Sequence, residues 1–509
     1  MSSHNQTSLS RRRFIKQIAG GAAALGAGTA LSPVLAQSSG SLPPAINTLT
    51  PGSVLRWIDS GDQKAVFYKA FFQQYAQNRG IEVIYDPLPW NEIAKVVPLG
   101  VRNKTAHDVF ALPQNTNPAD AVNEGWLQPY DDFIPDIDTW KAGFPEGAFL
   151  PGINVFDGKT YGLPFTSNKR SSTHLLFNRA YLQEAGFDPE TTALTHSDFR
   201  EAARKITENG KGRYFGFILG GNQIGRWSAI VRDIARLAGA SAGADSVIEA
   251  DIDFRTGEYT FDSDQYIQAV ELLIALQKDG SMFPGVMGIN APQARAFMPQ
   301  GAAGMILQGP WNIPAWESQN PEFDFGIGSA PLPDEGAAGH LTIGQGAAAP
   351  NTMWLWSGST QGAIAGDIFH YLGTLQGQTA WANVVGAGDP PIMPEAIENA
   401  DMSPRAKAVL QLFNEQIRVG PNPVVGNPAL SAVVSAFQAP DLSFALTVQG
   451  LVGGQLSDVS KEMKALKTRY DDALNQAFDK ARAAGSDVSR DDLVFANWNP
   501  ADDFGSKDY

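Results

Sequence analysis

The chain has 509 residues, more than a single hydrophobic core usually organises, so we expect two domains. Its formal charge of −15, from 38 basic and 53 acidic residues, argues against nucleic acid or an anionic membrane surface as a partner, because both attract concentrated Lys and Arg. The sequence has no cysteine, so we expect no disulfide, no thiolate metal site and no lipid-attached cysteine.

The first stretch with a recognisable pattern is an export signal. Residues 10–16 read SRRRFIK, which is typical of a twin-arginine signal, and a weakly apolar run over 18–35 follows. Residues 34–36 read VLA, so we expect a signal peptide over 1–36 that is cleaved after Ala36. No other stretch is long and apolar enough to suggest a membrane span, so a folded periplasmic protein without membrane insertion is expected.

Short apolar strands then alternate with amphipathic helices. The strands are expected at 54–58, 81–85 and 107–112, and the helices at 63–78 and 93–101. This alternation predicts a parallel sheet with helices on both faces. Asp62, Trp90 and Asn115 lie in the loops that follow these strands, although such residues, taken singly, are more often turn or packing residues than ligand contacts.

A second strand signal, further along the chain, ends in a tryptophan. Residues 305–307 read as a short buried strand, and Gly309 and Pro310 end it just before Trp311. Open α/β sheets bind ligands at the carboxyl edge of their strands. An indole there suits the C–H face of a sugar ring, and Asn312 could pair with hydroxyl groups. The alternative is that Trp311 is simply a core residue.

Several motifs occur in an order that resembles one family. They are GKTYGLP at 158–164, LLFNR at 175–179, AGF at 185–187, FDS at 261–263, LQKDG at 276–280, GPWN at 309–312 and FDFGIG at 323–328. Together they resemble the extracellular solute-binding proteins of ABC transporters, family 1, the relatives of maltose-binding protein. The resemblance covers about residues 52–400.

The resemblance implies an α/β, two-lobed periplasmic binding protein fold with discontinuous lobes joined by crossing hinge strands. The expected first lobe is 52–163 plus 330–387, the second is 166–326 plus 391–496, and 497–509 is a polar tail. Crossings are expected near 162–167, 325–331 and 386–391, where Gly and Pro suit segments that absorb backbone rotation.

The same resemblance implies a ligand site between the lobes. The residues expected to line it are Asp62, Trp90 and Asn115 in the first lobe, Phe165 at the hinge, Trp227, Trp311 and Asn312 in the second lobe, and Gly346, where the backbone approaches the ligand. Closure around the ligand requires contacts that favour the closed state over the open one.

The function implied is that of the substrate-binding component of an ABC import system, a monomer that captures a sugar and delivers it to the transmembrane permease subunits. We expect no cofactor and no metal. Two other ligand classes stay open. Arg226, beside Trp227, could serve a small anion, and Asp62 with Trp90 could serve a polyamine.

An exported enzyme is the remaining alternative. Residues 344–349 read GQGAAA, a weak dinucleotide-binding match because Pro350 follows where a helix should begin. A glycoside hydrolase needs two facing carboxylates, which spacing in sequence cannot show. The six histidines are scattered without metal-ligand spacing, and no G-x-S-x-G motif is present. Binding without turnover is therefore the preferred interpretation.

Overall fold

The computed structural model describes residues 42–509, apart from residues 62, 114–115, 244–247, 249–250, 337–338 and 347–350. The expected signal peptide and two of the expected site residues, Asp62 and Asn115, therefore lie outside the described residues.

The first lobe is built on a five-stranded sheet with the strand order β2-β1-β3-β14-β6. In that order its strands are Glu82–Pro87, Val54–Asp59, Val109–Ala111, Thr352–Leu355 and Gly162–Pro164. The first three are parallel, as the alternating pattern predicts, whereas β14 runs antiparallel to both β3 and β6. The sheet is therefore mixed, because a segment that returns from the second lobe completes it.

Aromatic side chains hold this sheet to its covering helices. Phe67, Tyr68, Phe71 and Phe72 lie on the buried face of helix α3, and the Trp57 ring of β1 is 5.1 Å from the Tyr68 ring. The helices of this lobe are α3 (Lys64–Arg79), α4 (Trp90–Arg102), α5 (Pro118–Asn123), α6 (Ile137–Lys141), α13 (Gly362–Leu372), α14 (Leu375–Val385) and α15 (Pro394–Glu398). A small hairpin adds β4 (Val155–Phe156) and β5 (Lys159–Thr160).

The second lobe is built on a four-stranded sheet with the strand order β12-β7-β11-β8. In that order its strands are Phe325–Gly328, His174–Asn178, Ala303–Gln308 and Phe215–Ile218. Strand β11 is buried along its whole length, which confirms the predicted buried strand before Trp311. The helices are α7 (Arg179–Ala185), α8 (His196–Gly210), α9 (Gly225–Leu237), α10 (Asp264–Lys278), α11 (Ala291–Phe297), α12 (Asn312–Gln319) and α16 (Pro404–Gln416), with β9 (Ile252–Asp253), β10 (Glu258–Tyr259) and the 3-10 turn η1 (Val286–Gly288).

Two of the predicted crossings run side by side. Thr166 and Pro391 form an antiparallel bridge, and the Ser167 amide donates to the Pro390 carbonyl over 2.9 Å. The crossing predicted at 325–331 is wrong, because β12 is a strand of the second sheet and Leu332 pairs with Thr195. Strand β13 (Leu341–Gly344) then pairs with β15 (Ile417–Gly420), so residues 330–344 belong with the second lobe.

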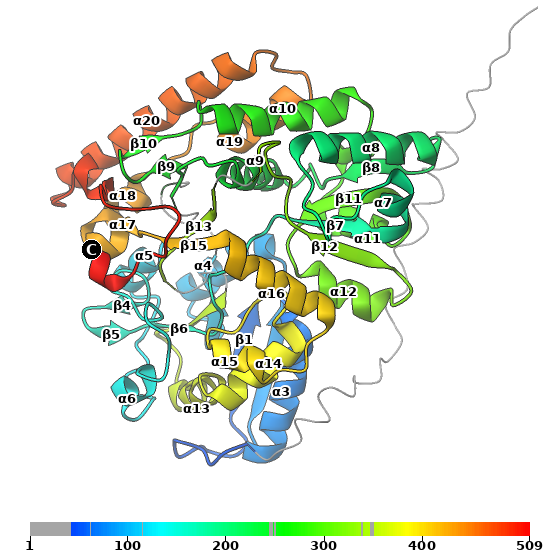
Figure 1. Cartoon of the computed structure of the whole chain (residues 1–509). Helices are drawn as coiled ribbons and strands as arrows, with labels where there is room; N and C mark the ends of the chain where they lie inside the picture. Colours follow the sequence, from blue (N-terminus) through cyan, green and yellow to red (C-terminus); the bar gives the residue numbers. More distant parts are fainter. Residues whose placement is uncertain are drawn as a thin grey trace, which may run out of the picture. The chain divides into compact units, whose positions relative to one another are not determined.

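The C-terminal segment packs onto the second lobe and also contacts the first, where the Ser435 hydroxyl donates to Asp120 Oδ1 at 2.7 Å. Helix α20 (Val459–Ala483) contacts α10, as Figure 1 shows. The other elements here are α17 (Pro423–Gly426), α18 (Ser431–Ala436), α19 (Phe444–Val452) and the 3-10 turns η3 (Pro428–Leu430), η4 (Arg490–Leu493) and η5 (Ser506–Asp508). The polar tail predicted at 497–509 is wrong, because Trp498 and Phe504 are buried and the Asn422 amide donates to the Tyr509 hydroxyl over 2.8 Å.

Candidate ligand-binding site

Polar residues gather at one edge of the first sheet. Strands β1 and β3 end at this edge, and the antiparallel β14 begins there. Asp59 is the last residue of β1, Lys64 begins α3, and Asn351 immediately precedes β14. The returning crossing brings Asp389 to the same place, so four polar side chains meet where open α/β sheets bind ligands.

Asp59 is fully buried and is held by several partners. Its Oδ1 accepts hydrogen bonds from the Tyr85 hydroxyl at 2.6 Å and from the Gly61 amide at 2.8 Å. The Lys64 ammonium lies 3.6 Å from the other carboxylate oxygen. The same ammonium lies 5.8 Å from the centre of the Trp90 ring, which is half-buried at the start of α4. A buried charge pair therefore lies beside the first predicted tryptophan.

Asp389 is the second buried carboxylate of this edge. It accepts hydrogen bonds from Gln63 Nε2 at 2.6 Å and from Asn351 Nδ2 at 2.7 Å, and it forms an ion pair with Arg170. Lys64 Nζ donates to Asn351 Oδ1 over 2.9 Å, which links the two carboxylates. We call this set the edge network; its members are Asp59, Gln63, Lys64, Arg170, Asn351 and Asp389. Its two carboxylates and two cationic side chains give the edge network no net formal charge.

Trp311 lies against the edge network from the second lobe. It follows β11, whose carboxyl end is next to the start of β7, and the Arg170 guanidinium carbon lies 6.0 Å from the centre of its ring. A Cβ placed on Gly388 would lie 3.2 Å from Trp311 Cα and 2.7 Å from Gln63 Nε2. Glycine therefore allows the hinge, the first lobe and the second lobe to approach closely at this point.

The structure thus brings Trp90 and Trp311 to one network, but it places two other predicted rings in the core. Phe165 is 1% exposed and stacks on Phe369 at 5.1 Å, so the prediction that it lines the site is wrong. The prediction that Trp227 lines the site is wrong for the same reason. Trp227 is fully buried, and its Nε1 donates to the Gly221 carbonyl over 2.9 Å.

Asn312 and Gly346 have less direct relations to the site. Asn312 is fully buried, and its amide nitrogen donates to Gln308 Oε1 at 3.1 Å, so it presents no group to a ligand here. Gly346 has φ +122°, a conformation that favours glycine, and a Cβ there would lie 3.3 Å from a methyl of Ile153. Its role as a close backbone approach stays a prediction.

Electrostatics fix the state of two neighbouring groups. Burial, with smaller contributions from Asp59 and Asp389, raises the pKa of Tyr68 well above its ordinary value, so this phenol stays neutral. Arg226 is buried beneath the second-lobe edge, where its guanidinium donates to the Ser172 carbonyl at 2.9 Å. Burial lowers the pKa of Arg226 to about 10. It is therefore not positioned to receive an anion from solvent.

Sequence reasoning missed most of the edge network. Arg170 and Asp389 lie beside the two crossings. The available signal was Asp389, because it is a charged residue between Gly388 and Pro390 in a segment that is itself a predicted crossing. The described part of the chain holds no group of three or more His, Asp or Glu side chains arranged for a metal ion. Among the described helices, none is long and apolar enough to cross a membrane.

The two lobes, the paired crossings and the polar edge define a two-lobed solute-binding protein. Residues 59–379 match the profile of the family described as bacterial extracellular solute-binding protein, and the chain belongs to this family. As its description says, this family groups solute-binding proteins that act outside the cell's interior.

The chain is also similar to curated relatives over part of its length. Binding proteins of Brucella abortus (strain 2308) and Brucella suis biovar 1 (strain 1330) are each 24% identical over 264 residues, 52% of this chain and 59% of theirs. The chain thus spans about three fifths of the length of these relatives.

Solved structures share the fold at low sequence identity. The GacH receptor of Streptomyces glaucescens has a TM-score of 0.62 at 16% identity, covering 84% of this chain and 99% of that one. A solute-binding protein of Thermotoga lettingae gives 0.60 at 17%, and the maltotriose-binding protein of Thermus thermophilus gives 0.58 at 18%, each covering 83% of this chain and 99% of its own.

Proposed function

We propose that this protein captures a neutral carbohydrate between its lobes and delivers it, unchanged, to the membrane subunits of an ABC importer. The ligand would lie between the carboxyl edges of the two sheets, with Trp90 on one side and Trp311 on the other. Indole faces offer apolar contact to sugar C–H groups, and the polar side chains of the edge offer hydrogen bonds to hydroxyls.

The observation that carries this proposal is the balance of charge in the edge network. Asp59 and Asp389 are already paired with Lys64 and Arg170, so the site offers no excess charge to an ionic ligand. Arg226, the residue that a small anion would need, is buried and bonded to backbone carbonyls. A neutral, hydroxyl-rich ligand is the class that remains suited to two indoles and a balanced network.

Similar proteins support the same ligand class. The GacH receptor is described in complex with acarbose, the Thermotoga lettingae protein with α-D-tagatose, and the Thermus thermophilus protein with maltotriose. The proposal also includes export to the periplasm by the twin-arginine route, which the SRRRFIK signal at residues 10–16 supports. We further propose that the protein acts as a monomer.

A thermal-shift screen with neutral mono- and oligosaccharides, polyols, polyamines and small anions tests the proposal. A ligand that binds only the native state, at about 100 times its Kd, adds about 2.7 kcal/mol to the free energy of unfolding. We expect a neutral saccharide to give the largest rise in Tm and to be recovered intact by chromatography. A rise with polyamines or anions alone, or conversion of the saccharide, would contradict the proposal.

A further inference from the structure

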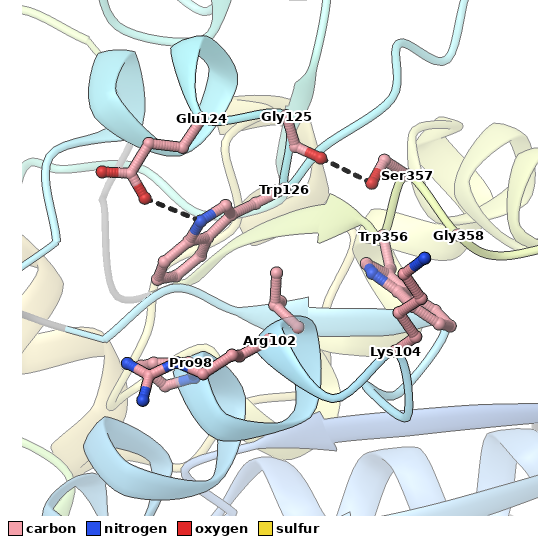
Figure 2. Close-up of a pocket in the computed structure, with 10 residues that line it drawn as sticks. Pro98, Arg102, Lys104, Glu124, Gly125, Trp126, Trp356, Ser357 and Gly358 are labelled. Carbon is pink, nitrogen blue, oxygen red and sulfur yellow. Dashed lines mark hydrogen bonds between the residues drawn. The ribbon is translucent and has the colours of Figure 1, made fainter.

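A hollow lies on the first lobe, away from the edge network. Its volume is about 750 Å³, and α4, the loop before β3, residues 124–126 and residues 356–358 line it (Figure 2). Strand β14 runs antiparallel to β3, so Trp356, just after β14, lies at the amino end of β3. The edge network lies at the carboxyl end. The hollow is therefore at the opposite edge of the same sheet.

Two indoles form opposite sides of this hollow. Figure 2 shows Trp126 and Trp356 coming from different segments, one on each side of the view. Trp126 is fixed by a 2.9 Å hydrogen bond from its Nε1 to Glu124 Oε2. The Trp356 ring lies so close to the backbone that a Cβ on Gly358 would be 2.4 Å from it, so only glycine fits there. Both rings are half-buried, so each keeps part of its surface open to solvent.

The two walls are tied together by hydrogen bonds. The Ser357 amide donates to the Trp126 carbonyl at 2.9 Å, and the Ser357 hydroxyl donates to the Gly125 carbonyl at 2.6 Å. Gln128 Nε2 donates to the Trp356 carbonyl at 2.7 Å. The rings are therefore held in place before any ligand arrives, which lowers the ordering cost of binding.

Two cations stand at the rim. Arg102 ends α4, Lys104 follows at φ 58°, and both side chains are exposed. Neither forms an ion pair within the part of the chain that the structure describes. The lining holds one acid, Glu124, and its hydrogen bond from the neutral Trp126 indole leaves its single negative charge in place, so the two cations outnumber it. A local positive excess therefore stands beside two indoles, in a chain whose net charge is −15.

We propose that this hollow is a second binding site, separate from the site between the lobes, for a saccharide unit that carries a carboxylate. The indoles would contact the C–H faces of the sugar ring, and the Arg102 guanidinium, a planar donor on the Trp126 side, would bind the carboxylate. Lys104, on the Trp356 side, would add a second positive charge at the rim. The volume falls within the range of about 300–1,000 Å³ that small-molecule sites occupy. This proposal does not depend on the neutral ligand proposed for the edge network.

Isothermal titration with digalacturonate, and with neutral galactobiose as the matched probe, tests it. We expect digalacturonate to bind the full chain, with galactobiose weaker by about tenfold because it lacks the charge that Arg102 and Lys104 recognise. Trp126→Ala and Trp356→Ala should each weaken digalacturonate binding by about tenfold or more. The Arg102→Gln/Lys104→Gln double variant, whose changes are on the surface, should weaken it about fivefold and remove its salt dependence.

Trp311→Ala is the matched control, because it alters an equally half-buried indole at the other edge and should leave digalacturonate affinity unchanged. Three outcomes overturn the proposal. These are no digalacturonate binding by the unaltered protein, equal binding of galactobiose, or binding that Trp311→Ala abolishes while the folded Arg102→Gln/Lys104→Gln variant retains it. The last would place the acidic sugar between the lobes instead.

Discussion

Arg170 and Asp389 form an ion pair that joins the two neighbouring crossings of the hinge. The Asp389 side chain is only 4% exposed, whereas that of Arg170 is 22% exposed and reaches toward the Trp311 ring. The carboxylate is also bonded to Gln63 and Asn351, so one hinge residue organises side chains from several parts of the chain. Removing its charge should therefore affect the whole edge.

We predict that Asp389→Asn lowers the free energy of unfolding by about 2–4 kcal/mol, because it leaves the Arg170 cation without its partner and replaces an acceptor oxygen with a donor. The lower half of this range is expected, since water reaches part of Arg170. Urea unfolding of both proteins measures the change. Asp441→Asn, at an exposed position, is the control and should be near neutral; an equal loss in both variants would contradict the argument.

Trp311→Ala should weaken binding of the cognate saccharide at least about tenfold while the protein stays folded, because the indole supplies apolar contact to the ring. The ring is half-buried, so its removal should cost less stability than removal of a core ring. Isothermal titration with the saccharide found by thermal shift measures the effect. Trp356→Ala, at the opposite edge of the first sheet, is the control. Unchanged affinity in Trp311→Ala would exclude this indole from the site.

The strands were predicted well from the sequence, because the apolar residues that form a strand and the Gly or Pro residues that end it are neighbours in the chain. Strand β11 lies where three apolar residues precede Gly309 and Pro310, and Trp311 stands beyond its carboxyl end as expected. Trp227 shows the limit of the same reasoning. Nothing in its neighbourhood reveals whether an indole on α9 points inward, and the structure shows it bonded to Gly221 within the core.

The edge network could not be predicted from spacing. Arg170 and Asp389 are 219 positions apart, and Lys64 and Asn351 are 287 apart. Only the folded crossings bring such residues together. The misplaced crossing has a related cause, because Gly and Pro near 325–331 mark an extended segment but do not say which sheet it joins. Pairing of Leu332 with Thr195 decides this.

Gly388→Ala should reduce affinity for the cognate saccharide severalfold, because a Cβ there meets Trp311 Cα at 3.2 Å and Gln63 Nε2 at 2.7 Å. Gln63 can move aside, but the Trp311 backbone must shift with its lobe, which favours separation of the lobes over closure. Titration calorimetry gives the affinity, and small-angle scattering gives the degree of closure. Gly288→Ala, with open space around its position, should change neither. A Gly388→Ala protein that closes and binds normally would refute this.

His174 should make stability depend on pH. Its ring is buried 5.1 Å from the Phe413 ring, and burial lowers its pKa from 6.5 to about 4. Between these values the unfolded chain binds a proton that the folded chain does not, so stability falls as pH falls. From about pH 7.5 to about pH 5 this group should cost about 2 kcal/mol. Urea unfolding at several pH values measures the free energy of unfolding. We expect this energy to fall less with falling pH in His174→Phe, by about the amount given above. His340→Gln, at a less buried ring, should keep most of the wild-type pH dependence. Equal slopes in wild type and His174→Phe would show that another group is responsible.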